Sequence, residues 1–367
     1  MSQPPTWPSV LSRLVAGVDL SSNEASWAMT EILAGNATPS QIGGFAMALR
    51  AKGESAAEVA AFVDVMLANA LVVERPDGPD VVLDVVGTGG DQSGSVNIST
   101  MSALVCASLG APIVKHGNRA ASSQTGTADV LEELGVAIDL SPEAVATCVQ
   151  QAGFGFCFAP NHHPSLRYAG PTRRELGVPT VFNILGPLTN PGLATTALVG
   201  CANPVLAPVM ADVLHRRGVS AVVVRSDDGL DEISTCAVTT AWDATGAQVE
   251  VVRIDPPALG IDLVDRHLLR GGDRARNADL LKLALGGGEA AGAGAGADAE
   301  AVRAIREVVA LNAATAMAAF AAAGQTATTP LLERIAAQLP STRAAVASGQ
   351  AMELLERWAR LTQTLRG

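Results

Sequence analysis

Apolar positions between residues 20 and 70 recur at helical spacing, as Ile42, Phe45 and Leu49 do. Three hydroxyl residues in this stretch are each followed three places later by Glu or Gln, which is the capping-box pattern of a helix start. These pairs are Ser21 with Glu24, Thr38 with Gln41, and Ser55 with Glu58. The pattern predicts three helices and no strand, so the N-terminal part of the chain is expected to form a small helical domain.

From residue 81 the pattern changes to short runs of β-branched and aromatic residues separated by helical segments. Strands are predicted at 81–86, 112–117, 154–159, 196–200 and 220–226. Helices are predicted at 98–109 and after starts near 127, 141 and 203, and alanine-rich helices follow toward the C-terminus. This alternation predicts a larger α/β domain with a mainly parallel central sheet flanked by helices on both faces.

Two segments do not follow either pattern. Residues 159–191 are rich in Pro, Gly, His and Arg, fit no strand, and are expected to be irregular. Long irregular connections in compact domains are usually functional or make an excursion to a neighbouring domain. Residues 286–297, GGGEAAGAGAGA, are expected to be a flexible insert without chemistry.

Composition narrows the classes of function. The chain has 367 residues, of which 48% are apolar, and a net charge of -11, so attraction to nucleic acid or to anionic membranes is not expected. Its five scattered cysteines form no CxxC pair, which argues against a disulfide framework or a zinc site. No segment is expected to cross a membrane, and a cytoplasmic location is expected.

The stretch DVVGTGGDQSGSVNIST, residues 84–100, places glycines and hydroxyl residues at the carboxyl end of a predicted strand and before a predicted helix. Open α/β sheets bind ligands at such strand ends, and main-chain N–H groups there can bind phosphate without a positive side chain. The spacing fits neither a Walker A loop nor the GxGxxG dinucleotide turn. A purely structural turn is the alternative interpretation.

Three further clusters carry polar chemistry. The segment KHGNRAASSQTGT, 115–127, follows the next predicted strand, and two such clusters at neighbouring strand ends favour one anion-binding crevice over two exposed loops. Asp231 and Glu232 could bind Mg²⁺ beside bound phosphates, or belong to a solvated acidic turn. Arg173 and Arg174 could grip a planar carboxylate, or be an ordinary solvated pair.

Taken in order, the motifs GTGGD (87–91), NIST (97–100), KHGNRAASS (115–123), GPTRRELG (170–177), NILGPLTNP (183–191) and DEIS (231–234) resemble those of the anthranilate phosphoribosyltransferase family of tryptophan biosynthesis. The resemblance covers most of the chain. It implies transfer of the phosphoribosyl group of phosphoribosyl pyrophosphate (PRPP) to the amine of anthranilate, with release of pyrophosphate. It also implies a homodimer formed through the helical domains.

The resemblance implies a helical domain at 1–72 with a returning segment at about 163–186, and an α/β domain at 73–162 and 187–367. It implies two Mg²⁺ ions per subunit, with Ser99, Asp231 and Glu232 as ligands. Anthranilate would contact Gly87, His116, Asn118, His163 and Arg173. PRPP would contact Gly87, Gly90, Asp91, Ser95, Asn97, Ile98, Ser99, Thr100, Lys115, His116, Gly117, Asn118, Arg119, Ala120, Ala121, Ser122, Ser123 and Thr127.

Two other functions share this scaffold. A pyrimidine nucleoside phosphorylase-like enzyme would need a nucleobase pocket in place of the KHGNR motif at 115–119. A non-enzymatic nucleic-acid-binding relative should be basic, whereas this chain is acidic.

Overall fold

The computed structural model describes residues 4–75, 77–120, 124–287 and 297–366. Four helices form the N-terminal part: α1 (Trp7–Val15), α2 (Ser22–Leu33), α3 (Pro39–Lys52) and α4 (Ala56–Ala68). The three predicted helix starts are confirmed, each with its reciprocal capping box. Helix α1 was not predicted, because its cap pairs Thr6 with Ser9 rather than with Glu or Gln.

A seven-stranded sheet forms the centre of the larger domain, in the order β3-β2-β1-β4-β5-β6-β7. The five predicted strands are present as β1 (Leu83–Gly87), β2 (Ile113–Gly117), β3 (Phe154–Phe158), β4 (Thr196–Gly200) and β5 (Ser220–Ser226), all parallel. Two antiparallel strands, β6 (Thr239–Asp243) and β7 (Glu250–Ile254), were missed. β7 is mostly exposed, so its short apolar run gave a weak signal.

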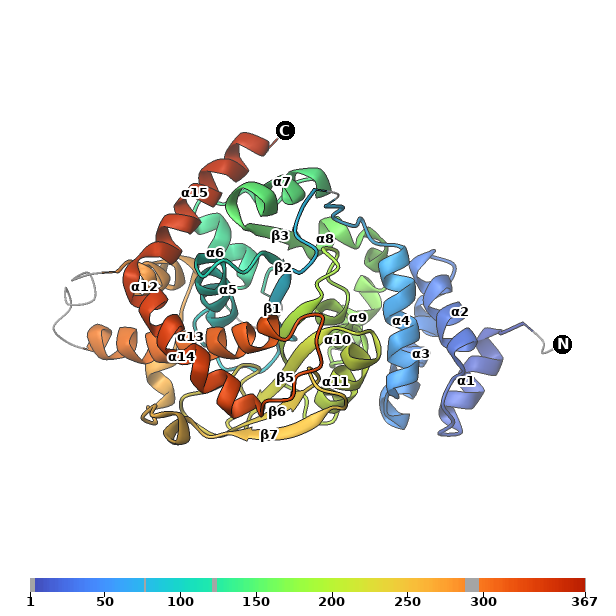
Figure 1. The fold of residues 1–367 in the computed structure, drawn as a ribbon. Helices are drawn as coiled ribbons and strands as arrows, with labels where there is room; N and C mark the ends of the chain where they lie inside the picture. Colours follow the sequence, from blue (N-terminus) through green and yellow to red (C-terminus); the bar gives the residue numbers. More distant parts are fainter. Residues whose placement is uncertain (1–3, 76, 121–123, 288–296, 367) are drawn as a thin grey trace.

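Alternate residues along the strands face two separate cores. Val85 and Leu198 pack on the face covered by α5 (Ile98–Ser108) and α13 (Ala297–Ala321), whereas Val86 and Val199 face α10 (Phe182–Leu188) and α11 (Leu206–Arg216). The second core continues into the N-terminal helices, which lie at one side of the molecule in Figure 1. Five further α-helices belong to the larger domain: α6 (Thr127–Glu133), α7 (Pro142–Ala152), α12 (Arg274–Leu285), α14 (Leu331–Ser348) and α15 (Gln350–Leu365).

The expectation that residues 159–191 are irregular was wrong. They form α8 (Ala159–His162), the 3₁₀ helix η1 (Pro164–Tyr168), α9 (Gly170–Leu176) and α10. Three prolines of this segment stand in the first turns of α8, η1 and α9, where a proline is tolerated because its missing N–H would have no partner, and a fourth, Pro187, lies inside α10. η1 packs on α2, and α9 packs on α3. The domain boundaries themselves remain a prediction.

One helix of the described residues resembles a membrane-spanning helix in length and composition. Residues Ala299–Ala321, within α13, are long and apolar enough to cross a membrane by length and composition alone. However, 72% of the apolar window is buried inside the protein. Core helices of large domains pass the same test, and α13 lies between α14 and the sheet.

Candidate active site

The glycine loop follows β1 and is tied to a distant segment. Gly271 N–H donates to the Gly94 carbonyl at 2.8 Å, and Val96 N–H donates to the Leu269 carbonyl at 3.0 Å. Within the loop Gln92 has a φ of 55°, a left-handed conformation that is unusual for a residue with a side chain. These main-chain bonds and the turn at Gln92 give the loop its shape, and the Gly89, Ser93 and Ser95 N–H groups donate to side chains of the protein.

The acidic turn after β5 lies directly against this loop. The Asp231 Oδ2 atom accepts a hydrogen bond from Gly89 N–H at 2.7 Å. Burial, together with the neighbouring Asp91 carboxylate, raises the pKa of Asp231 to about 7. Burial and the adjacent Asp231 raise the pKa of Glu232 to about 8, against the lowering effect of Lys115. Three acidic side chains are thus gathered where water cannot fully solvate their charge.

Such a cluster fits a divalent cation. Asp91 Oδ2 is buried and has no hydrogen-bond partner, so an oxygen ligand is left free beside two buried carboxyl groups. No group of three or more His, Cys, Asp or Glu side chains with metal-site geometry exists in the described part of the chain. Mg²⁺ does not require one, because it keeps several waters and takes substrate phosphate oxygens alongside one or two carboxylates.

Sequence reasoning missed Gly200, which stands at the end of β4 opposite Gly87 of β1. The main chain of Asp231 crosses directly over Gly200, and a Cβ there would lie 2.5 Å from the Asp231 carbonyl carbon and closer still to its oxygen. A Cβ on Gly87 would likewise come closer than 3.0 Å to Asp231 Oδ2. The two glycines therefore admit the acidic turn, a relationship that neither segment reveals alone.

Lys115 joins the second cluster to the first. Its side chain is buried, and its Nζ donates to the Val85 carbonyl and to Ser99 Oγ, the latter at 3.3 Å. Burial lowers the pKa of Lys115 below its ordinary value, although the nearby Asp84 and Glu232 carboxyl groups oppose this shift. The ammonium group thus lies between the strand that leads into the glycine loop and the helix α5 that follows it.

The segment after β2 is held by α6. Arg119 forms ion pairs with Asp129 at 3.0 Å and with Glu132 at 2.5 Å, so its predicted role in PRPP binding competes with two carboxylates of the protein. Thr100 Oγ1 donates to Thr127 Oγ1 at 3.5 Å. Asn118 Oδ1 accepts the Arg119 N–H at 2.7 Å. The predicted contacts Ala121, Ser122 and Ser123 lie outside the described residues.

Asn97 has a partner that the sequence analysis did not identify. The Asn277 side chain donates to Asn97 Oδ1 at 2.9 Å and accepts the Gly272 N–H at 2.7 Å. Asn277 lies in the segment GGDRARNAD, whose Gly271 N–H also bonds the Gly94 carbonyl. This segment therefore supports the end of the loop that leads into α5. Ile98, the first residue of α5, is buried in the core.

Three of the five residues predicted to bind the acceptor, His116, His163 and Arg173, contact α10 or the residue that follows it. His116 and His163 have ring centroids 5.2 Å apart, and burial lowers the pKa of His116 to about 3 and that of His163 to about 4, so both are neutral. His116 Nε2 is buried without a partner. Arg173 stacks on the Phe182 ring at 5.7 Å. In the described part of the chain, no carboxylate pairs with Arg173.

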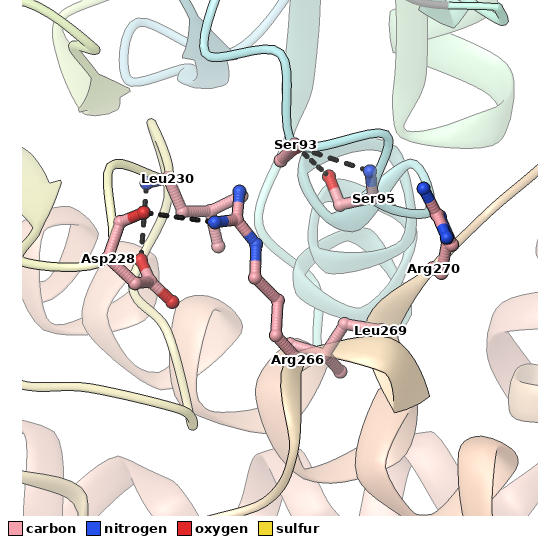
Figure 2. A pocket seen from close by; sticks show the side chains of 7 residues that line it. All are labelled: Ser93, Ser95, Asp228, Leu230, Arg266, Leu269 and Arg270. Carbon is pink, nitrogen blue, oxygen red and sulfur yellow. Dashed lines mark hydrogen bonds between the residues drawn. The ribbon is translucent and has the colours of Figure 1, made fainter.

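A hollow lies on the outer side of the glycine loop. In Figure 2, Ser93 and Ser95 lie between the side chains of Arg266 and Arg270. The Arg266 guanidinium donates to the Asp228 carbonyl at 3.2 Å, and Ser93 Oγ donates to Ser95 Oγ at 3.1 Å. Leu230 and Leu269 complete the lining. Two cations beside the loop add positive potential to an otherwise acidic protein.

A helical bundle joined to an α/β domain is the architecture of a glycosyl transferase family. Residues 8–70 match the helical bundle domain of that family, and residues 79–358 match its a/b domain. An anthranilate phosphoribosyltransferase of Saccharopolyspora erythraea is 48% identical over 98% of this chain and 97% of its own length. One from Acidothermus cellulolyticus is 49% identical over 99% and 97%.

Solved structures agree with this assignment. A crystal structure of anthranilate phosphoribosyltransferase from Thermus thermophilus superposes with a TM-score of 0.83 at 36% identity, covering 96% of this chain and 99% of that one. The Saccharomyces cerevisiae enzyme in complex with PRPP and Mg gives a TM-score of 0.83 at 25% identity, covering 98% of each chain. The chain belongs to the anthranilate phosphoribosyltransferase family.

Proposed function

We infer that this protein transfers the 5-phosphoribosyl group of PRPP to the amine of anthranilate, giving N-(5-phosphoribosyl)anthranilate and pyrophosphate in tryptophan synthesis. The observation that carries the inference is the convergence of the Gly89 amide, the buried Asp231 and Glu232, and Lys115 at neighbouring strand ends. Relatives at 48–49% identity over nearly the whole chain carry this name.

The chain's own residues would bind and orient rather than attack. Displacement at the anomeric carbon develops positive charge on the ribose and negative charge on the departing pyrophosphate. Main-chain N–H groups of the glycine loop and the Lys115 ammonium group would stabilise that negative charge. When bound at Asp231, Glu232 and Ser99, Mg²⁺ would supply the remaining positive charge at the phosphate oxygens.

The acceptor needs no activation by a charged base, because an aromatic amine is neutral and nucleophilic at pH 7. Arg173, which has no carboxylate partner among the described residues, would hold the anthranilate carboxylate by paired hydrogen bonds. His116 is neutral and its Nε2 is unpartnered, so it could accept a hydrogen bond from the amine. Holding the amine against the sugar supplies the rate gain expected from proximity and orientation.

Several finer features belong to the same proposal. We expect two Mg²⁺ ions per subunit, a homodimer formed through the N-terminal helices, and a cytoplasmic location. Val15 and Met47, on α1 and α3, are exposed apolar side chains that such a dimer would cover. We also expect 163–186 to belong structurally with residues 1–72, since η1 and α9 pack on α2 and α3.

The test is direct incubation of the purified protein with PRPP, anthranilate and Mg²⁺. Anthranilate fluorescence should fall, and pyrophosphate should appear in equal amount, with no reaction when the metal is chelated. Phosphorolysis of a pyrimidine nucleoside and binding of nucleic acid are tested in parallel. Fluorescence that stays constant, with either of those activities present, would contradict the proposed function.

A further inference from the structure

The motif NILGPLTNP, residues 183–191, contributes a buried residue with no role in the function proposed above. Asn190 donates from Nδ2 to Asp84 Oδ2 at 2.6 Å and to the Val114 carbonyl at 2.6 Å, and its Oδ1 accepts the Gly192 N–H at 2.7 Å. Both ends of the amide are therefore used. Asn190 lies 106 positions from Asp84 in the sequence, so this contact exists only in the fold.

Asp84 is the second buried member of the pair. It lies on β1 with 1% of its surface exposed, and its Oδ1 accepts the His116 N–H of β2 at 3.2 Å. Burial raises its pKa to about 6, against the lowering effects of Lys115 and Asn190. A buried carboxyl group is costly unless hydrogen bonds compensate it, so an apolar residue would serve better here if packing were the only requirement.

The pairing of the strands shows what the carboxyl group does. β1 pairs with β4, and β2 with β3, over five residues each, but β1 and β2 are matched only at Leu83 and Ile113. Beyond that point side chains satisfy main-chain groups that face the gap: Asp84 bonds His116 N–H, Asn190 bonds the Val114 carbonyl, and Lys115 bonds the Val85 carbonyl. These side-chain bonds replace main-chain hydrogen bonds between β1 and β2, and we call the side chains that make them the polar wedge.

We propose that Asp84 and Asn190 are positioning residues that hold the carboxyl ends of β1 and β2 apart. The glycine loop follows β1, and the segment 115–119 ends β2 and begins the loop after it, so the width of the wedge sets the distance between the two halves of the PRPP site. The proposal rests on the proposed function. Neither residue needs to touch a substrate, because a polar spacer fixes the geometry through the strands.

A pair of single variants and their combination separates spacing from residue identity. Asp84→Asn points an amide donor at the Asn190 donor, and Asn190→Asp places two carboxyl groups face to face. Each should raise the Kd for PRPP with Mg²⁺, measured by titration calorimetry, by about tenfold, the loss expected when a buried hydrogen bond is broken. The double swap restores a donor facing an acceptor between residues 84 and 190 but leaves the Val114 carbonyl without its donor, so the Kd should recover in part, to a value below that of either single variant.

Asp243→Asn is the matched control. Asp243 ends the remote strand β6, and its buried carboxylate pairs with Arg334 of α14. The control variant should lower the melting temperature and leave the Kd for PRPP unchanged. If the two single variants fail to fold, Asn190→Ser is measured in their place, and its shorter side chain should also raise the Kd for PRPP. Singles with an unchanged Kd, or a double swap without recovery, would overturn the spacer role. A wild type that binds no PRPP would instead overturn the proposed function.

Discussion

Replacing Gly200 by alanine would change a residue that lies in none of the motifs of the predicted site. The new Cβ would lie 2.5 Å from the carbonyl carbon of Asp231, whereas ordinary van der Waals contact begins at 3.4 Å. The turn carrying Asp231 and Glu232 must therefore move away by more than about 1 Å, because the strand below it is fixed in the sheet and the Asp231 carbonyl oxygen lies nearer still to the new Cβ. A displacement of that size at a catalytic group can cost roughly a hundredfold in rate.

We therefore expect Gly200→Ala to lower kcat/KM by about a hundredfold and to raise the Mg²⁺ concentration that gives half-maximal activity. The assay is the loss of anthranilate fluorescence during a Mg²⁺ titration at saturating PRPP. Gly246→Ala is the matched control, because its Cβ would meet only ordinary contacts at 3.6 Å. A Gly200→Ala protein with wild-type rates and metal dependence would refute the account of the acidic turn.

Three further changes test other parts of the molecule. Arg173→Ala should raise KM for anthranilate by about tenfold or more while KM for PRPP stays within about twofold, because a paired carboxylate contact is lost; equal effects on both KM values would count against that role. Asp231→Asn should abolish Mg²⁺-dependent activity but raise the melting temperature of the metal-free protein at pH 8. The stability cost of the Asp231 carboxyl group grows as pH rises from its ordinary pKa of 3.8 to its folded pKa of about 7, so scanning fluorimetry should show a smaller gain for Asp231→Asn at pH 5 than at pH 8. Glu58→Ala should lower the free energy of unfolding by about 3 kcal/mol, because it leaves the buried Lys52 ammonium group without this partner. Chemical denaturation measures that loss, and an unchanged unfolding midpoint would contradict it.

Much of the fold could be predicted because its signals are local. A hydroxyl residue followed by Glu or Gln identified α2, α3 and α4, and runs of β-branched or aromatic residues identified five parallel strands. Helix α1 and strands β6 and β7 were missed where the local signal was weak. The connector 159–191 was misjudged because three of its prolines stand in the first turns of short helices, and Pro187 lies inside α10 without ending it.

The residues of the candidate site are of two kinds, which differ in what dictates the residue type. Residues expected to touch a ligand, such as Asp231 and Lys115, have their type dictated by ligand chemistry, so motifs reveal them. Residues that set the spacing have their type dictated by another part of the chain. Gly200 has no Cβ because the Asp231 main chain passes over it, and Asn190 is an amide because Asp84 needs a donor.

A change in the spacing of the strands is therefore expected to impair this site. The main-chain N–H groups at the strand ends cannot adjust to a changed width, because backbone groups move only with their strands, and the Lys115 side chain is itself held by the Val85 carbonyl and Ser99 Oγ. In an acidic protein the loss cannot be offset by general electrostatic attraction for a phosphorylated sugar either. Substitutions at Gly200, Asp84 or Asn190 should therefore weaken PRPP binding as strongly as removal of a direct contact.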